Sequence, residues 1–107
     1  MSVFKIRDYR RASGNDTVEF EVEFRDGELA AGDTFYCYDT HHPVPYTVRA
    51  LQRDGRNATL KCDGEFCYDD AFVDGVVDTT QKGRPAGFHY EGPTPLLFDF
   101  RRRCPSR

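Results

Sequence analysis

Hydrophobic and polar residues alternate most strictly over residues 17–25, which read TVEFEVEFR. β-branched or aromatic residues take every second position, and glutamates or an arginine take the positions between them. A period of two places successive side chains on opposite faces of a β-strand, whereas a helix would spread the apolar residues around its circumference. The pattern therefore predicts a strand with one face buried and the other in water.

Similar patterns predict further strands on both sides of this one. Shorter segments with alternating apolar positions precede and follow it, and clusters of Gly, Asn, Asp and Pro separate them as turns. The expected strands cover residues 3–9, 34–38, 46–53, 58–62 and 96–100, with an extended crossing segment around 88–90. No long stretch repeats its apolar positions every 3.6 residues, and short strands separated by turns favour a barrel or a sandwich.

We therefore expect an all-β fold, a small antiparallel Greek-key-like barrel of six to eight strands that forms one domain over residues 1–107. Residues 101–107 are expected to form a short basic tail. Residues 39–45, DTHHPVP, are expected to form a loop, because prolines cannot donate to a central ladder. The residues expected to fill the core are Phe4, Ile6, Val18, Phe20, Val22, Phe24, Leu29, Phe35, Val48, Leu60 and one of Leu97 and Phe98.

Composition and charge fit such a domain and limit its partners. The 107 residues include nine Phe and six Tyr, more aromatic residues than a disordered chain carries. A formal net charge of −3 argues against a domain whose whole surface binds nucleic acid. No apolar run approaches the roughly 20 residues that span a bilayer, and the first ten residues lack the apolar core of a secretory signal. We expect a cytoplasmic protein with no membrane contact, in which the cysteines are reduced.

Residues 27–35, GELAAGDTF, have the form Gly-x-Leu-x-x-Gly-Asp-x-Phe and follow an alternating strand. This phrase resembles the turn between two strands in the second-domain β-barrel of translational GTPases such as elongation factor Tu. The resemblance covers residues 3–78 and implies a barrel with a binding role, in which Leu29 plugs the barrel end. The chain departs from the family where Val22 and its neighbours fill a region that usually holds a glycine. It also has no Gly-x-x-x-x-Gly-Lys-Ser/Thr motif, so neither GTP binding nor GTPase activity is expected.

The sequence carries no recognisable catalytic motif, since neither a Gly-x-Ser-x-Gly nor a His-Glu-x-x-His segment is present. It favours a non-catalytic binding module with a protein or RNA partner. Arginines can contact phosphates, and an exposed tyrosine can stack on bases. The candidate binding residues are His41, His42, Tyr46, Arg101, Arg102 and Arg103.

The cysteines allow a second interpretation, although the sequence implies no definite cofactor. Cys62 and Cys67 are separated by four residues, and with Cys37 and His41 they could complete four zinc ligands. Cys37 and Cys62 also continue an inward alternation, which is typical of small core residues, and no second pair has the spacing of a zinc knuckle. A small enzyme of unknown reaction is a third hypothesis, with its site either in the loop expected over residues 39–45 or near Cys67, the candidate nucleophile.

Overall fold

The computed structural model describes residues 2–12, 17–39 and 42–91, and these residues form one antiparallel seven-stranded sheet. The strands are, in chain order, β1 (Ser2–Arg11), β2 (Thr17–Gly27), β3 (Thr34–Asp39), β4 (His42–Asp54), β5 (Asn57–Asp63), β6 (Gly75–Asp78) and β7 (Phe88–Tyr90). A single turn of 3-10 helix, η1 (Pro85–Gly87), precedes β7. The strand expected at 96–100 and the tail expected at 101–107 lie outside the described residues.

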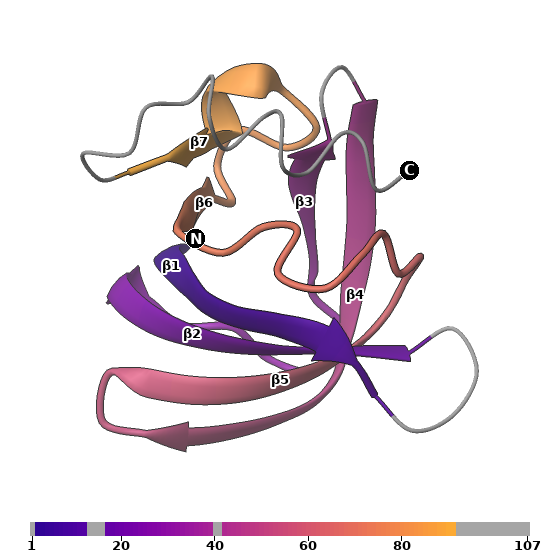
Figure 1. The fold of residues 1–107 in the computed structure, drawn as a ribbon. Helices are drawn as coiled ribbons and strands as arrows, with labels where there is room; N and C mark the ends of the chain where they lie inside the picture. The colour runs from indigo at the N-terminus through magenta and orange to yellow at the C-terminus, as the bar shows by residue number, and fades with distance from the viewer. Residues whose placement is uncertain (1, 13–16, 40–41, 92–107) are drawn as a thin grey trace.

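The sheet curls into a nearly closed barrel (Figure 1). The strand order is β3-β4-β5-β2-β1-β6-β7, and the curl brings β3 against β6 and β7. Strands β3, β4 and β5 follow one another through hairpins, and β2 returns beside β5, which is the arrangement of a Greek key. The predicted fold class, an all-β antiparallel Greek-key-like barrel, is confirmed.

Period-two alternation explains most of the barrel interior. The described residues include all the core positions predicted from the sequence except Leu97 and Phe98, and each of them is buried. Burial of one Phe-sized side chain contributes about 1.5–3 kcal/mol of transfer free energy, so this row of aromatic and aliphatic residues is the main stabilising feature. The interior also contains residues that were not predicted as core, among them Tyr9, Tyr46, Phe72, Val76, Val77 and Phe88.

Three β-bulges shift the alternation, and each places an extra arginine on the outside. The extra residues are Arg7 in β1, Arg25 in β2 and Arg49 in β4, at the register shifts between the paired strands. Each arginine contacts a carboxylate: Arg7 lies 2.9 Å from Glu23, Arg25 lies 2.5 Å from Glu91, and Arg49 lies 3.5 Å from Asp63. The bulges bend the strands enough for one sheet to wrap around its own core.

The prediction of a loop over residues 39–45 is wrong for its described part, because β4 begins at His42. Pro43 and Pro45 pair with Tyr38 and Tyr36 in the β3–β4 ribbon. Here β4 is paired on one side only, since its ladder with β5 starts at Thr47. A proline that lacks an N–H fits such an edge without loss of a ladder hydrogen bond.

The connection between β5 and β6, residues 64–74, crosses the barrel (Figure 1). A buried pair of tyrosines binds this connection through hydrogen bonds. The Tyr46 hydroxyl donates to the carbonyl of Glu65 at 2.6 Å, and its oxygen lies 2.9 Å from the Tyr9 hydroxyl. The Cys67 N–H donates in turn to the Tyr9 oxygen at 3.0 Å. We call this series, from the Cys67 amide through Tyr9 and Tyr46 to the Glu65 carbonyl, the tyrosine relay. It gives two backbone groups of an irregular segment the partners that burial requires.

Removal of the Tyr46 hydroxyl should destabilise the barrel without a change in its packing volume. We expect Tyr46→Phe to lower the free energy of unfolding by about 1–3 kcal/mol, because it removes the bond to Tyr9 and the shorter of the two hydrogen bonds to the Glu65 carbonyl, and leaves that carbonyl with the 3.3 Å bond from Tyr9. The measurement is urea unfolding followed by circular dichroism.

The matched control is Tyr36→Phe. The Tyr36 side chain is half-buried on the outer face of β3, and its hydroxyl makes no hydrogen bond to another described residue. This variant should stay within about 0.5 kcal/mol of the wild type. Equal effects of the two variants would contradict a structural role for the relay.

Candidate functional site

Of the predicted binding residues, only His42 and Tyr46 lie in the described part of the chain. His42 is exposed at the first position of β4, opposite Asp39. Tyr46 is fully buried inside the barrel, so it cannot present its ring to a base, and the expectation that it belongs to a binding surface is wrong. His41, Arg101, Arg102 and Arg103 lie outside the described residues.

The cysteines proposed as zinc ligands occupy different surroundings. Cys37 and Cys62 are buried on the inner faces of β3 and β5, whereas Cys67 is half-buried in the β5–β6 connection. Within residues 2–12, 17–39 and 42–91, no three His, Cys, Asp or Glu side chains are arranged to hold a metal ion. His41, the fourth ligand of that hypothesis, is not among these residues.

Burial also keeps the interior hydroxyls and thiols protonated. Desolvation raises the pKa of the Cys62 thiol to about 12 and that of Cys37 well above its ordinary value. The pKa values of Tyr9 and Tyr46 are raised as well, again chiefly by burial. Neutral thiols are poor nucleophiles and poor metal ligands, so Cys37 and Cys62 act as core residues.

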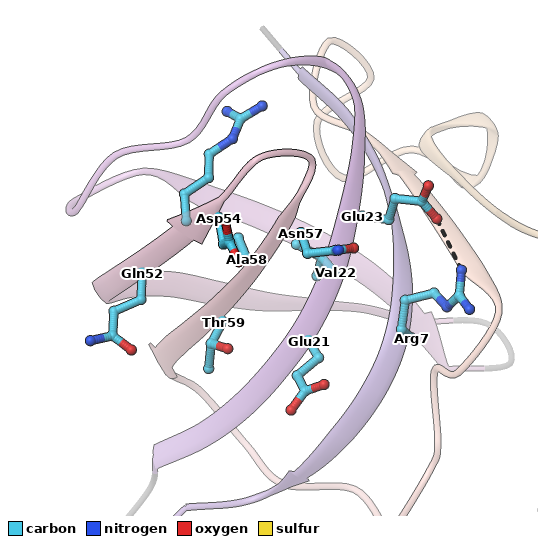
Figure 2. Close-up of a pocket in the computed structure, with 10 residues that line it drawn as sticks. Arg7, Glu21, Val22, Glu23, Gln52, Asp54, Asn57, Ala58 and Thr59 are labelled. Atoms are coloured by element: carbon cyan, nitrogen blue, oxygen red, sulfur yellow. Dashed lines mark hydrogen bonds and ion pairs between the residues drawn. The ribbon is translucent and has the colours of Figure 1, made fainter.

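The candidate site is instead an open groove of about 840 Å³ on the outer face of the barrel (Figure 2). The end of the β4–β5 hairpin forms one side, and β2 with the bulge of β1 forms the other. We call it the hairpin groove; its lining residues are Arg7, Glu21, Val22, Glu23, Gln52, Arg53, Asp54, Asn57, Ala58 and Thr59.

Strand register explains why polar side chains gather in the hairpin groove. Thr59 pairs with Gln52 on one side and with Glu21 on the other, and Asn57 pairs in the same way with Asp54 and Glu23. Residues opposite each other in neighbouring strands point to the same face of a sheet. Figure 2 shows these side chains on one side of the strands, with Arg7 joined to Glu23.

Four of these side chains make no hydrogen bond with another described residue, so their polar atoms are open to a ligand. These side chains belong to Gln52, Asp54, Asn57 and Thr59. Together they offer amide donors, carbonyl and carboxylate acceptors, and one hydroxyl. The hairpin side of the groove therefore has hydrogen-bonding capacity that the fold leaves unused.

The charged groups give the hairpin groove an acidic character. It holds the carboxylates of Glu21, Glu23 and Asp54 and the guanidinium groups of Arg7 and Arg53. Arg7 is engaged by Glu23, and Arg53 lies over the ring of Phe24. Among the lining residues the carboxylates outnumber the guanidinium groups by one; Glu21 is paired with Arg10 at 3.0 Å, and Asp54 forms no ion pair with the described residues.

Sequence reasoning missed the hairpin groove, although one signal was present. The glutamates of β2 and the polar residues of the Asp54–Asn57 turn are typical of any solvated strand face. Only the paired register of β2, β4 and β5 brings them together. The alternation of residues 17–25 indicated an outward glutamate row without indicating what lies opposite it.

Comparison with family models, with curated proteins and with solved structures found no match for this chain. No helix among the described residues is long and apolar enough to cross a membrane. The function therefore has to be argued from the geometry of the barrel and its groove.

The raised pKa values predict that stability falls at alkaline pH. Unfolded thiols and phenols ionise near their ordinary pKa values of 9.0 and 10.0, whereas the buried groups stay protonated. The unfolded chain then binds fewer protons than the folded chain, so the contribution of these groups to stability is constant below about pH 8 and declines above pH 9. Each group contributes a slope of up to about 1.4 kcal/mol per pH unit.

The measurement is urea unfolding in the presence of a reductant at neutral pH and at several values above pH 9. The free energy of unfolding of Tyr46→Phe should decline less steeply above pH 10 than that of the wild type, because the variant carries one buried phenol fewer. A free energy of unfolding that stays constant to pH 10.5 would be incompatible with protonated buried groups.

Proposed function

We propose that this barrel is a non-catalytic module that binds an extended, basic segment of a partner protein in the hairpin groove. The observation that carries the proposal is a set of four side chains, Gln52, Asp54, Asn57 and Thr59, that line the groove without a hydrogen-bonding partner among the described residues. An extended peptide presents N–H and C=O groups along its length, and side-chain amides can bond to both kinds.

The charge of the groove favours a polypeptide over an RNA. Asp54, which forms no ion pair with the described residues, repels phosphates, whereas Glu21 is already paired with Arg10. The groove's guanidinium groups already contact Glu23 and the Phe24 ring. Lysine or arginine side chains of a partner would pair with the same carboxylates and fix its register. This argument applies to the hairpin groove and leaves the arginines at 101–103 aside.

The described residues also offer no arrangement typical of catalysis. The buried thiols and phenols have raised pKa values, and no group of metal-binding side chains is assembled among residues 2–12, 17–39 and 42–91. A binding role fits these observations better than an enzymatic one.

The similarity to the second domain of translational GTPases remains part of the proposal. The turn that carries it has geometry that suits the motif, since Gly32 has φ 99° and the Asp33 carboxylate accepts the Ala30 N–H at 2.9 Å. Leu29 is 8% exposed and packs against the core. We therefore propose a barrel of that general build, used here for binding alone.

A peptide of alternating glycine and lysine, blocked at both ends, tests the proposed function. In a titration followed by amide NMR shifts, we expect changes that concentrate at Glu21, Gln52, Asp54 and Thr59 and that weaken as salt is added. Asp54→Asn should lower the affinity by about two- to fivefold, the loss expected for one exposed ion pair.

Two controls accompany this titration. The first is Glu28→Gln, which removes an exposed carboxylate outside the groove and should leave the affinity unchanged. The second is a peptide of alternating glycine and glutamate, which should not bind. Shift changes spread evenly over the surface, or equal binding of both peptides, would refute the proposal.

A further inference from the structure

Arg53 lines the hairpin groove between Gln52 and Asp54, but its guanidinium group is directed at the ring of Phe24. Alternation along β4 places its side chain on the other face of the strand from those of Gln52 and Asp54. There its guanidinium carbon lies 4.4 Å from the centroid of the Phe24 ring, which is 2% exposed. A guanidinium over an aromatic face at this distance is held by a cation–π interaction.

The same guanidinium joins two further pieces of backbone. Arg53 Nε donates to the carbonyl of Gly55 at 2.8 Å, within the hairpin turn, and Nη1 donates to the carbonyl of Gly27 at 3.3 Å, at the end of β2. One other bond ties this turn to β2, from the Phe24 N–H to the Arg56 carbonyl at 2.7 Å. The turn itself extends beyond the last β2–β5 ladder pair, between Glu23 and Asn57.

We propose that Arg53 is the positioning residue of the hairpin groove. It holds the end of the β4–β5 hairpin against β2 and Phe24, next to the ladder pairs that Asn57 makes with Asp54 and Glu23, and so it keeps this end of the groove in position. The expected effect of Arg53 on peptide binding rests on the proposed function. The expected effect of Arg53 on the hairpin does not. Lysine cannot replace Arg53, because an ammonium group lacks the planar fork that reaches two carbonyls in different directions.

Electrostatics and positioning predict opposite effects when Arg53 is changed. Removal of a positive charge beside an acidic groove strengthens the attraction for a basic peptide if charge alone matters. Release of the hairpin weakens binding, because the hydrogen-bonding groups on the two sides of the groove are no longer held in place. The sign of the change in affinity therefore distinguishes the two roles.

The experiment compares Arg53→Met with Arg56→Met in the full chain. Methionine keeps the packing of the aliphatic stem and removes the charge and the donors. Arg56 lies in the same turn, and its side chain makes no hydrogen bond or ion pair with another described residue, so its variant removes the same charge alone. The two readouts are amide hydrogen exchange over residues 54–57 and affinity for the glycine–lysine peptide.

In Arg53→Met we expect exchange over residues 54–57 to be about five- to tenfold faster and affinity to fall by about twofold or more. Arg53→Lys should resemble Arg53→Met, and Arg56→Met should keep wild-type exchange and bind equally or more tightly. Unchanged exchange in Arg53→Met, or tighter peptide binding, overturns the inference. If the wild type itself does not bind the peptide, the proposed function fails, and the exchange data still decide whether Arg53 holds the hairpin.

Discussion

The hydrogen bond between the buried hydroxyls of Tyr9 and Tyr46 is the interaction on which the position of the β5–β6 connection depends. The two tyrosines come from β1 and β4, which are not neighbours in the sheet, and between them they bind the backbone at Glu65 and Cys67. The β5–β6 connection has no strand ladder of its own to satisfy these groups. Because the relay binds this connection, the chain can cross the barrel and β6 can pair with β1.

This arrangement places two hydrogen-bonded hydroxyl groups among the aromatic rings of the interior. Within the described residues, no buried side-chain nitrogen or oxygen lacks a hydrogen-bonding partner. Rings of Phe20, Phe35 and Phe72 lie edge-on or tilted against the two tyrosines, with centroids 4.9–6.1 Å apart. The hydroxyls are therefore held in an environment that penalises ionisation and penalises the loss of either partner.

The sequence was sufficient for the fold class and for most of the core, because alternation reports directly which face of a strand is buried. It was insufficient where a bulge moves the alternation by one residue, as at Arg7, after which Tyr9 rather than Asp8 faces inward. The sequence was also insufficient where the backbone approaches a side chain so closely that only glycine fits. Gly64 packs against Tyr46 so tightly that a Cβ there would lie 2.4 Å from the ring, and the sequence shows only a glycine.

The candidate site was harder to predict than the fold for a related reason. The motifs singled out from the sequence were local clusters, the histidine pair, the cysteines and the arginines at 101–103. The hairpin groove is lined by residues of four strands, β1, β2, β4 and β5, and none of these polar residues forms a motif within its own segment. Its shape depends on strand register and on a turn held by Arg53, and both are properties of pairing across the sheet rather than of any one segment.

Amide hydrogen exchange at Cys67 tests most directly whether the tyrosine relay organises this barrel. The Cys67 N–H lies in an irregular connection, and its described acceptor is the buried Tyr9 hydroxyl. If the relay is as described, this amide should exchange only through global unfolding, as slowly as the amides of β2 and β5. Exchange at the rate of an open surface loop would contradict the account.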